Sequence, residues 1–230
     1  MTSLDDWLQH AARCDHIRQC RADDTNIDTE LAKLNDWAVR DGLATDCEGL
    51  GSYAGFVGPT YRSARRRILY VAVNPGQYSD AKWPLQRERL ERYAANEKAE
   101  RVFEWEANVV WPVGRNRKWQ ALFRAAGRDD WRELAFTNTV LCPTSQDISP
   151  NHVVRQRCIE SHLIPLVDLV KPHVVIFMSM SNQEHVFDSA RGALTTRRLP
   201  NATIDHPSRR GEGQNAQHIL RQVQAALRPL

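Results

Sequence analysis

Polar residues that could bind a ligand follow three of the strands expected in this chain, at the point where each strand ends. They begin the segments Asn74-Pro75-Gly76 and His206-Pro207-Ser208, and Asn138 stands between these segments along the chain. Ligands of open α/β sheets bind beyond the carboxyl ends of the strands. An Asn amide presents a donor and an acceptor side by side, so it can pair with the edge of a planar polar ligand. Each segment alone is a common turn or packing residue, but the three together predict a ligand site.

The cysteines are a second group that could do chemistry. The chain has five of them, Cys14, Cys20, Cys47, Cys142 and Cys158. An odd number of cysteines in a chain without an export signal argues against a disulfide scaffold. The residues alone therefore leave two interpretations open, buried free thiols or a metal site.

The cationic side chains are mostly arginines, since 26 of the 31 Lys and Arg residues are Arg. Arg presents a planar fork that matches a phosphate group with two parallel hydrogen bonds. Several arginines cluster, at 65–67, 115–117, 197–198 and 209–210. A codon-biased genome and solvated surfaces explain the same composition, and the net charge is only +3. Nucleic-acid binding is therefore open but not established by charge.

The composition is that of a globular protein. Of the 230 residues, 42% are hydrophobic and 26% are charged, which excludes a disordered or fibrous chain. The longest strictly apolar run, Val174–Met178, is far shorter than the roughly 20 residues of a membrane-spanning helix. The first residues, MTSLDDWLQH, carry neither a basic nor an apolar stretch of a signal peptide. We therefore expect a soluble cytoplasmic protein that makes no contact with a membrane.

Short apolar runs alternate with helical patterns along the chain. The runs that stop at turn residues predict strands at 68–73, 134–140, 174–178 and 203–204. Helical spacing predicts helices within 1–48 and at 84–107, 117–126, 151–170 and 213–227, and the Gly-rich stretch 49–61 predicts a loop. The expected fold is a single α/β domain with a short, mostly parallel four-stranded sheet flanked by helices. A helical segment, 1–48, would pack on the α/β core, 49–230.

The three strand-end segments resemble motifs of the uracil-DNA glycosylase superfamily. Ala72-Val-Asn-Pro-Gly76 is similar to the Gly-Met-Asn-Pro-Gly motif of the single-strand-selective branch, with Ala in place of the first Gly. Pro75–Asp80 resembles the Pro-Gly-x-x-Glu-Asp of the iron–sulfur branch, and Phe136–Pro143 resembles the strand that bears the base-reading Asn. The His-Pro-Ser segment matches the last family motif. The resemblance covers about residues 50–225 and departs from the family in the long charged insert 81–115.

The resemblance implies an enzyme that flips a nucleotide out of DNA and hydrolyses its glycosidic bond. His206 would donate a hydrogen bond to the pyrimidine O2, where negative charge develops, and Asn74 would position the attacking water. Asn138 would read the Watson–Crick edge of the base. A carboxylate, Asp80 or with less support Asp205, would activate the water or stabilise the cationic sugar.

The same resemblance assigns roles to neighbouring residues. Tyr78 would stack on the base beside Gly76, and Ser208, Arg209 and Arg210 would contact the DNA where the family's wedge loop enters the duplex. The motifs themselves contain no Lys that could form a Schiff base, which favours a monofunctional glycosylase that leaves an abasic site. The partner would be single- or double-stranded DNA with a damaged or modified base, and we expect the enzyme to act as a monomer.

The iron–sulfur branches give the cysteines a role. Fifteen residues separate Cys142 from Cys158, a spacing that resembles the last two cluster ligands of those branches. Their first two ligands normally form Cys-x2-Cys, whereas five residues separate Cys14 from Cys20. These four residues would complete a [4Fe–4S] site that joins the N-terminal helices to the core, with Cys47 left free. Free buried thiols, or a zinc site that uses His16, are the alternatives.

Other functions are compatible with parts of the sequence. Within the glycosylases, the enzyme would either repair deaminated cytosine or remove hypermodified cytosine from phage DNA, and the atypical motifs with a long insert slightly favour the antiviral role. A non-catalytic module that binds flipped bases would share the fold. A nucleotide-cofactor enzyme is disfavoured, because the chain has neither G-x-G-x-x-G nor G-x-x-x-x-G-K-[ST].

Overall fold

The computed structural model describes residues 1–43, 53–75, 79–110, 122, 131–145, 148–179, 184–207 and 214–228. The chain divides into two compact units, each built from three segments. The helical unit comprises Met1–Gly55, Asn74–Val102 and Asn138–Leu169, and the sheet unit comprises Phe56–Val73, Phe103–Thr137 and Val170–Leu230. Within the described segments, every helix is too short or too polar to cross a lipid bilayer.

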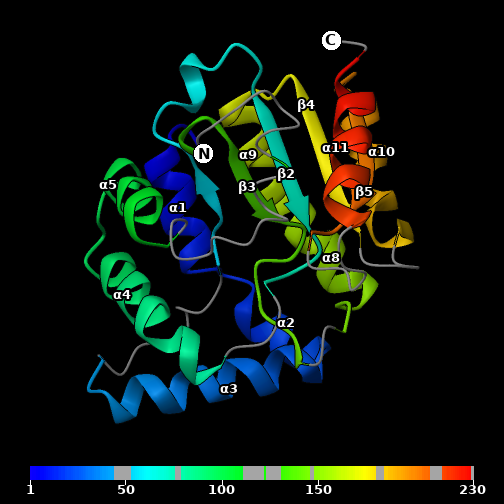
Figure 1. The fold of residues 1–230 in the computed structure, drawn as a ribbon. Helices are drawn as coiled ribbons and strands as arrows, with labels where there is room; N and C mark the ends of the chain where they lie inside the picture. Colours follow the sequence, from blue (N-terminus) through cyan, green and yellow to red (C-terminus); the bar gives the residue numbers. More distant parts are fainter. Residues whose placement is uncertain are drawn as a thin grey trace. The chain divides into compact units, whose positions relative to one another are not determined.

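The sheet has five strands in the order β1-β3-β2-β4-β5 (Figure 1). The strands are β1 Phe56–Val57, β2 Ile68–Ala72, β3 Ala135–Asn138, β4 Val174–Ser179 and β5 Asn201–Asp205. β2, β4 and β5 are parallel, whereas β1 runs antiparallel to β3. The prediction of an α/β fold with helices around a sheet is confirmed. The prediction of four mostly parallel strands is not exact, because the sheet is mixed and has a fifth strand that pairs antiparallel.

The fifth strand, β1, lies in the Gly-rich stretch that was expected to be a loop. It has only two residues, so no alternation of apolar and polar residues marks it. Gly58 follows it and donates a backbone hydrogen bond to the carbonyl of Leu134. A Cβ atom at Gly58 would overlap with the backbone carbonyl of Arg132. The glycine that suggested a loop is therefore needed for close approach of two backbone segments.

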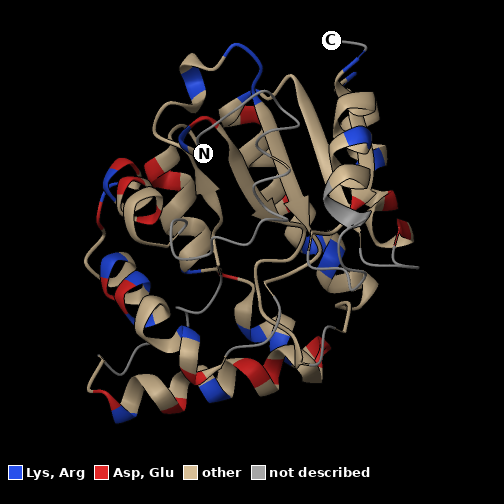
Figure 2. Ribbon diagram, viewed as in Figure 1, with Lys and Arg blue, Asp and Glu red and all other residues tan. Residues whose placement is uncertain are grey.

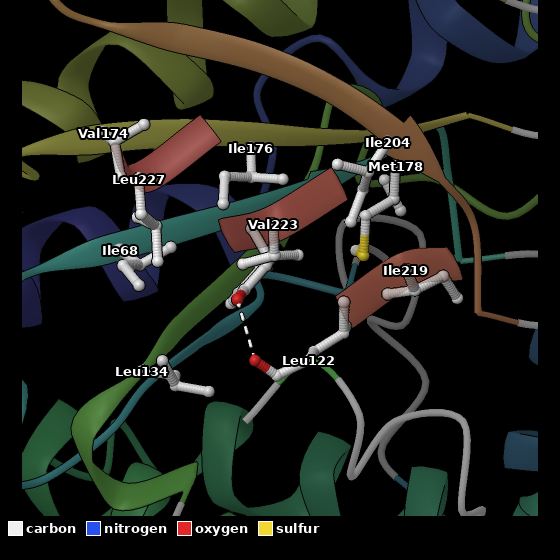
Figure 3. Close-up of a cluster of buried hydrophobic side chains, with 12 residues drawn as sticks. Ile68, Leu122, Leu134, Val174, Ile176, Met178, Ile204, Ile219, Val223 and Leu227 are labelled. Carbon is white, nitrogen blue, oxygen red and sulfur yellow. Dashed lines mark hydrogen bonds between the residues drawn. The ribbon is translucent and has the colours of Figure 1, made fainter. Parts of the chain in front are cut away.

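The central strands are buried on both faces. Every residue of β2 and β4 is buried, which explains why each is a continuous apolar run and not an alternating one. On one face, α11 (Gln214–Leu227) packs on the sheet. Ile219, Val223 and Leu227 of this helix belong to one hydrophobic cluster with strand residues that include Ile68 and Ile176 (Figure 3). The helical spacing of these three residues predicted the apolar face that makes this contact.

Short helices complete the sheet unit. They are η2 Tyr61–Ser63, the π-helical turn η4 Glu106–Val110, η5 Trp131–Glu133, η8 Glu184–Phe187 and α10 Asp188–Thr196. Phe187 of η8 packs against Phe177 of β4 with ring centroids 4.8 Å apart. Tyr70 of β2 donates a hydrogen bond from its hydroxyl to the carbonyl of Leu122. A buried phenol usually needs such a partner.

The helical unit begins with three short helices, α1 Leu4–Ala12, α2 Ile17–Asp23 and α3 Thr25–Arg40. Ser3 and Asp6 form a capping box at the start of α1. Asp24 caps α3 through its Oδ1 and also accepts a hydrogen bond at Oδ2 from the backbone amide of Asn151. Asn151 in turn caps α8 (His152–Cys158) by accepting from the amide of Val154. The two caps therefore fix α2 and α3 next to the start of α8.

The charged segment expected as one exposed helix over 84–107 is two helices. α4 spans Trp83–Ala94 and α5 spans Ala99–Trp105, and Asn96 between them has a left-handed backbone with φ of 53°. Leu90 and Tyr93 are buried on one side of α4, as the spacing predicts. Figure 2 shows cationic and acidic residues alternating along the outer turns of α3 and α4, as in the ion pair between Arg92 and Glu88. Such exposed pairs contribute little stability, about 0–1 kcal/mol each.

The helix expected over 151–170 is interrupted by one wide turn. α8 ends at Cys158, the π-helical turn η7 spans Ile159–Leu163, and α9 spans Ile164–Val170. The indole of Trp7 in α1 donates a hydrogen bond to the carbonyl of His162 in this turn, at 3.0 Å. Single π-helical turns inside a helix occur frequently at functional sites.

Candidate functional site

Four of the five cysteines are free, buried thiols of the helical unit. Cys14 follows α1, Cys20 lies in α2, Cys142 follows β3, and Cys158 ends α8. Three separate stretches of the chain therefore contribute these thiols. Cys47 lies outside the described residues.

The four thiols form one group, hereafter the cysteine cluster. Burial raises the pKa of Cys142 well above its usual value, and the neighbouring Cys14 and Cys20 raise it further. Cys158 donates a hydrogen bond to Cys20, which together with burial raises its own pKa, and each of the other cysteines of the cluster adds to this effect. Burial raises the pKa of Cys14 to about 11, with a smaller contribution from Cys20. The shift of Cys158 thus includes contributions from all three other cysteines, which places the four thiols in one neighbourhood.

Cys20 is the cysteine of the cluster whose pKa is lowered, so it loses its proton more readily than an ordinary thiol. The hydrogen bond from Cys158 and the guanidinium of Arg157 lower the pKa of Cys20 to about 7, against the opposing effect of burial. Nη1 of Arg157 lies 3.5 Å from the Cys20 Sγ, and its Nη2 lies 2.9 Å from a carboxylate oxygen of Asp23. The caps that join α2 to α8 through Asp24 and Asn151 bring this Arg and both cysteines together.

His162 contacts the cluster from the π-helical turn. Its Nε2 lies 3.2 Å from the Sγ of Cys14, and its ring lies 5.1 Å from that of His10, between centroids. Burial, together with His10 and His16, lowers the pKa of His162 to about 3, so this imidazole is neutral at physiological pH. No sequence pattern indicated this residue, because it contacts a cysteine 148 residues away along the chain.

The four cysteines are of the chemical type that binds a soft metal, although their arrangement in the structure is not that of a metal centre. Soft thiolate ligands bind zinc and iron–sulfur clusters, and four buried cysteines are the full ligand set of a [4Fe–4S] group. Across the segments that the structure describes, no three or more His, Cys, Asp or Glu side chains are already arranged around a metal position. Binding would therefore require the thiols to move together while they lose their protons.

The three predicted strand-end residues each stand at or just after the end of a strand along the chain. Figure 1 shows β3 beside β2 and running in the same direction, and β2 is parallel to β4 and β4 to β5. Asn138 is the last residue of β3, His206 directly follows β5, and Asn74 comes two residues after β2. By the division into units, Asn74 and Asn138 belong to the helical unit and His206 to the sheet unit.

Asn74 is held by a buried hydroxyl. Its Nδ2 donates a hydrogen bond to the Oγ1 of Thr144 at 2.7 Å, and Thr144 donates its own proton to the carbonyl of Ile148 at 2.6 Å. The hydroxyl therefore can only accept from Asn74, which fixes the amide with its nitrogen toward Thr144 and leaves Oδ1 as the acceptor for another group. Thr144 was not predicted, since Thr has no characteristic spacing to an Asn 70 residues earlier.

Asn138 carries a buried amide donor without a partner. The residue is 2% exposed, and its Nδ2 has no hydrogen-bond partner among the described residues. An unmade hydrogen bond of this kind costs about 1–3 kcal/mol. The Nδ2 of Asn138 is therefore a donor available for a ligand.

His206 and Asp205 end β5. The His206 backbone amide donates to the carbonyl of Ser179 at the end of β4, at 2.8 Å, and the imidazole is half-buried. Asp205 has partners in α11, because its Oδ2 lies 3.0 Å from Nε2 of His218 and its amide donates to Gln222. These contacts give Asp205 a structural function that holds β5 to α11.

Of the remaining predicted site residues, the structure describes one, Asp80, and does not describe the other five. Asp80 begins the short helix η3, Asp80–Lys82, and its side chain is exposed. The residues that lie outside the described segments are Gly76, Tyr78, Ser208, Arg209 and Arg210. Their roles in stacking and DNA contact stay predictions.

Comparison with known proteins gives no relative on which to base a function. No protein-family model matches the chain, and no curated protein matches it.

Proposed function

We propose that this chain is a monofunctional DNA glycosylase that flips a uracil-like or modified pyrimidine out of DNA and hydrolyses its glycosidic bond. The observation that carries the proposal is the buried, unpartnered Nδ2 of Asn138 at the end of β3. A flipped pyrimidine offers a carbonyl or ring-nitrogen acceptor on its Watson–Crick edge, and pairing with it would satisfy this donor. The sequence supports the same proposal, because Asn74 comes two residues after β2 and His206 directly after β5, and ligands of open α/β sheets bind beyond the carboxyl ends of the strands.

The hydrolysis follows from the hydrogen bonds and charges that each side chain can offer to the water, the base and the sugar. With its nitrogen bonded to Thr144, Asn74 presents Oδ1 to a water molecule and orients it for attack on the anomeric carbon. His206 donates a hydrogen bond to the pyrimidine O2 as the glycosidic electrons move onto the base, a contribution of about 3–4 kcal/mol. The base leaves as an anion that His206 stabilises and then takes a proton from solvent, while Asp80 stabilises the cationic sugar. Asn74 cannot accept the proton that the attacking water loses, so Asp80 accepts it.

The DNA contacts and cofactor belong to the same proposal. Ser208, Arg209 and Arg210 bind the phosphates next to the flipped nucleotide, and the protein acts as a monomer in the cytoplasm. The cysteine cluster would hold a [4Fe–4S] group, which supplies structure and no chemistry at the base.

A panel of oligonucleotides tests the function. Duplexes and single strands would carry uracil, hydroxymethyluracil or glucosylated hydroxymethylcytosine, and alkali would then cleave the strand at any abasic site. We expect cleavage for at least one base, and the atypical first motif favours a modified base and an antiviral role. Cleavage at uracil alone would assign the enzyme to repair. DNA binding without an abasic product from any substrate would contradict the glycosylase proposal and identify a non-catalytic binding module.

The cysteine cluster makes a separate prediction. Protein purified without oxygen should be brown, absorb light at about 400 nm, and contain iron and sulfide. Cys158→Ser should lose most of the iron and unfold at a lower temperature, because a bound cluster contributes to folding. Cys47→Ser is the matched control and should retain both. A colourless, metal-free and fully active wild-type protein would rule the cluster out.

Thr144 makes a prediction about the water. Thr144→Val keeps the shape of the side chain but removes the acceptor for Asn74, so the amide can rotate. We expect the excision rate constant to fall about 10-fold with little change in KM, which corresponds to about one hydrogen bond. Thr144→Ser should restore the rate, because it keeps the hydroxyl. Equal rate constants for the Val and Ser variants would show that Thr144 does not orient Asn74.

A further inference from the structure

The three parallel strands of the sheet unit begin side by side. β2 pairs with β4 from Ile68 and Val174 onward, and β4 pairs with β5 from Val175 and Asn201 onward. α11 ends at the same place, because its last residue, Leu227, belongs to one hydrophobic cluster with Ile68 and Val174 (Figure 3). The starts of β2, β4 and β5 and the end of α11 therefore form one edge of the sheet unit, hereafter the amino edge.

The segments at the amino edge are cationic. They contain seven Arg and one Lys, hereafter the basic residues of the edge, which are Arg62, Arg65, Arg66, Arg67, Lys171, Arg197, Arg198 and Arg228. No Asp or Glu stands in the segments that contain them, 58–68, 170–174, 194–201 and 223–228. Glu133 of η5, which packs against η2, and Asp168 of α9 offset only two of the eight charges. The whole chain has 31 cationic and 28 acidic residues, so composition does not explain this separation of charge.

The basic residues of the edge are accessible and lie on a fixed frame. Six of them are exposed, and Arg66 and Arg67 are half-buried. Nε of Arg67 donates a hydrogen bond to the carbonyl of Lys171 at 2.8 Å, and the amide of His173 donates to the carbonyl of Arg67 at 2.8 Å. These bonds join the segment before β2 to the segment before β4. Figure 2 shows blue segments before β2 and at the end of α11, both where the parallel strands begin.

Two of the basic residues have a left-handed backbone. Lys171 directly follows α9 with a φ of 48°, and Arg198 comes two residues after α10 with a φ of 56°. Glycine is the usual residue at such a position, because a left-handed backbone strains an L side chain. A cation one turn earlier would interact with the same helix dipole without that strain. Both positions therefore carry a charge where the backbone alone favours glycine, which agrees with a ligand-binding function of that charge.

The prevalence of arginine favours phosphate as the ligand of this edge. The planar fork of Arg binds a phosphate group with two parallel hydrogen bonds, and seven of the eight basic residues are Arg. The edge crosses three strands that lie about 4.8 Å apart, so it extends about 10 Å. The phosphates of one DNA strand follow one another by about 3.4 Å along the helix axis. About three successive phosphates of a nucleic acid therefore match the edge, whereas a single phosphate would use only part of it.

We propose that the basic residues of the amino edge bind the sugar–phosphate backbone of a nucleic acid without sequence preference. This surface lies at the other end of β5 from His206, and a strand of five residues extends about 16 Å. It therefore contacts a different stretch of backbone from the one next to a base held by His206. The surface requires neither the proposed glycosylase activity nor a metal at the cysteine cluster.

A triple variant of the full-length protein, Arg62→Gln with Arg65→Gln and Arg198→Gln, tests this surface. Its binding to an unmodified DNA duplex of about 30 base pairs would be measured by fluorescence anisotropy at several salt concentrations. We expect the Kd at about 100 mM salt to rise about 10-fold or more. The slope of log Kd against log salt should fall by about 2–3, because each lost phosphate contact removes about 0.9 from it.

The matched control removes the same charge from the helical unit. Arg18, Arg40 and Arg101 are exposed residues of α2, α3 and α5, and their joint replacement by Gln should leave the Kd and its salt dependence as in the wild type. Equal DNA affinities for the two triple variants would overturn the proposal. A loss of binding to phosphatidylserine vesicles in the amino-edge variant, with unchanged DNA binding, would overturn it as well and assign the edge to a lipid surface.

Chemical modification of the wild-type protein tests the same surface if the variant does not fold. Phenylglyoxal would modify the arginines with and without DNA, and mass spectrometry would locate the modified residues. DNA should protect Arg62, Arg65 and Arg198 and leave Arg40 and Arg101 reactive. The same degree of protection at all five residues, or none at any, would overturn the proposal. Failure of the oligonucleotide panel would contradict the glycosylase activity and not this surface, because the binding is measured with unmodified DNA.

Discussion

Replacement of His206 by Ala should lower the rate of base excision by about 100-fold or more, because one hydrogen bond to the developing anion is lost. The affinity for DNA should remain nearly unchanged, since the imidazole acts mainly in the transition state. Single-turnover excision and a binding titration at fixed salt would measure the two effects separately. The main chain of His206 is held by Ser179 of β4, so the variant should retain the strand end.

His185→Ala is the matched control for this variant. His185 is an exposed residue of η8, and its replacement should change neither the excision rate nor the binding. If His206→Ala excised its substrate at the wild-type rate, the assignment of the catalytic edge would be wrong, whatever the binding data showed.

Asn138→Leu should separate function from stability. Leu has nearly the shape of Asn but cannot pair with a base, so excision should fall by about 100-fold, the equivalent of two lost hydrogen bonds. The free energy of unfolding should not fall, because the substitution removes a buried amide donor that has no partner. Thermal unfolding and single-turnover excision of the same preparation would measure both quantities.

The control for this variant is the same substitution at a satisfied amide. Nδ2 of Asn201, at the start of β5, donates a hydrogen bond to the carbonyl of Leu199. Asn201→Leu should therefore lose about 1 kcal/mol of stability and keep its excision rate. If Asn138→Leu instead unfolded more easily and still excised the base, its amide would have a structural role and no role in recognition.

The sequence predicted the elements that are apolar and continuous. The predicted runs at 68–73 and 174–178 become the buried central strands β2 and β4, because a strand covered on both faces favours apolar side chains along its length. β1 could not be predicted, since its two residues are too few for any pattern. The break between α4 and α5 was missed for a related reason. Asn96 adopts a left-handed backbone. A glycine at this position would have indicated such a turn in the sequence, whereas an asparagine is a weaker signal.

The sequence predicted the strand-end residues of the candidate site but not the residues that contact them. Asn74, Asn138 and His206 follow strand ends that the apolar runs predict, and their catalytic roles stay predictions. Thr144 and His162 could not be found, because each acts through a contact with a residue at least 70 positions away. For the cysteines, the family resemblance indicated four ligands, although the spacing between Cys14 and Cys20 differs from the family motif.

The short strand β1 also protects the side of the sheet that carries Asn138. Phe56 and Val57 pair with Phe136 and Ala135 of β3, so the backbone groups of β3 on that side are already occupied. Beyond them, the border offers only a two-residue strand for an incoming chain, too short to template fibrillar growth. β3 can therefore end in an unsatisfied polar group, the amide of Asn138, without making the protein prone to self-association along that border.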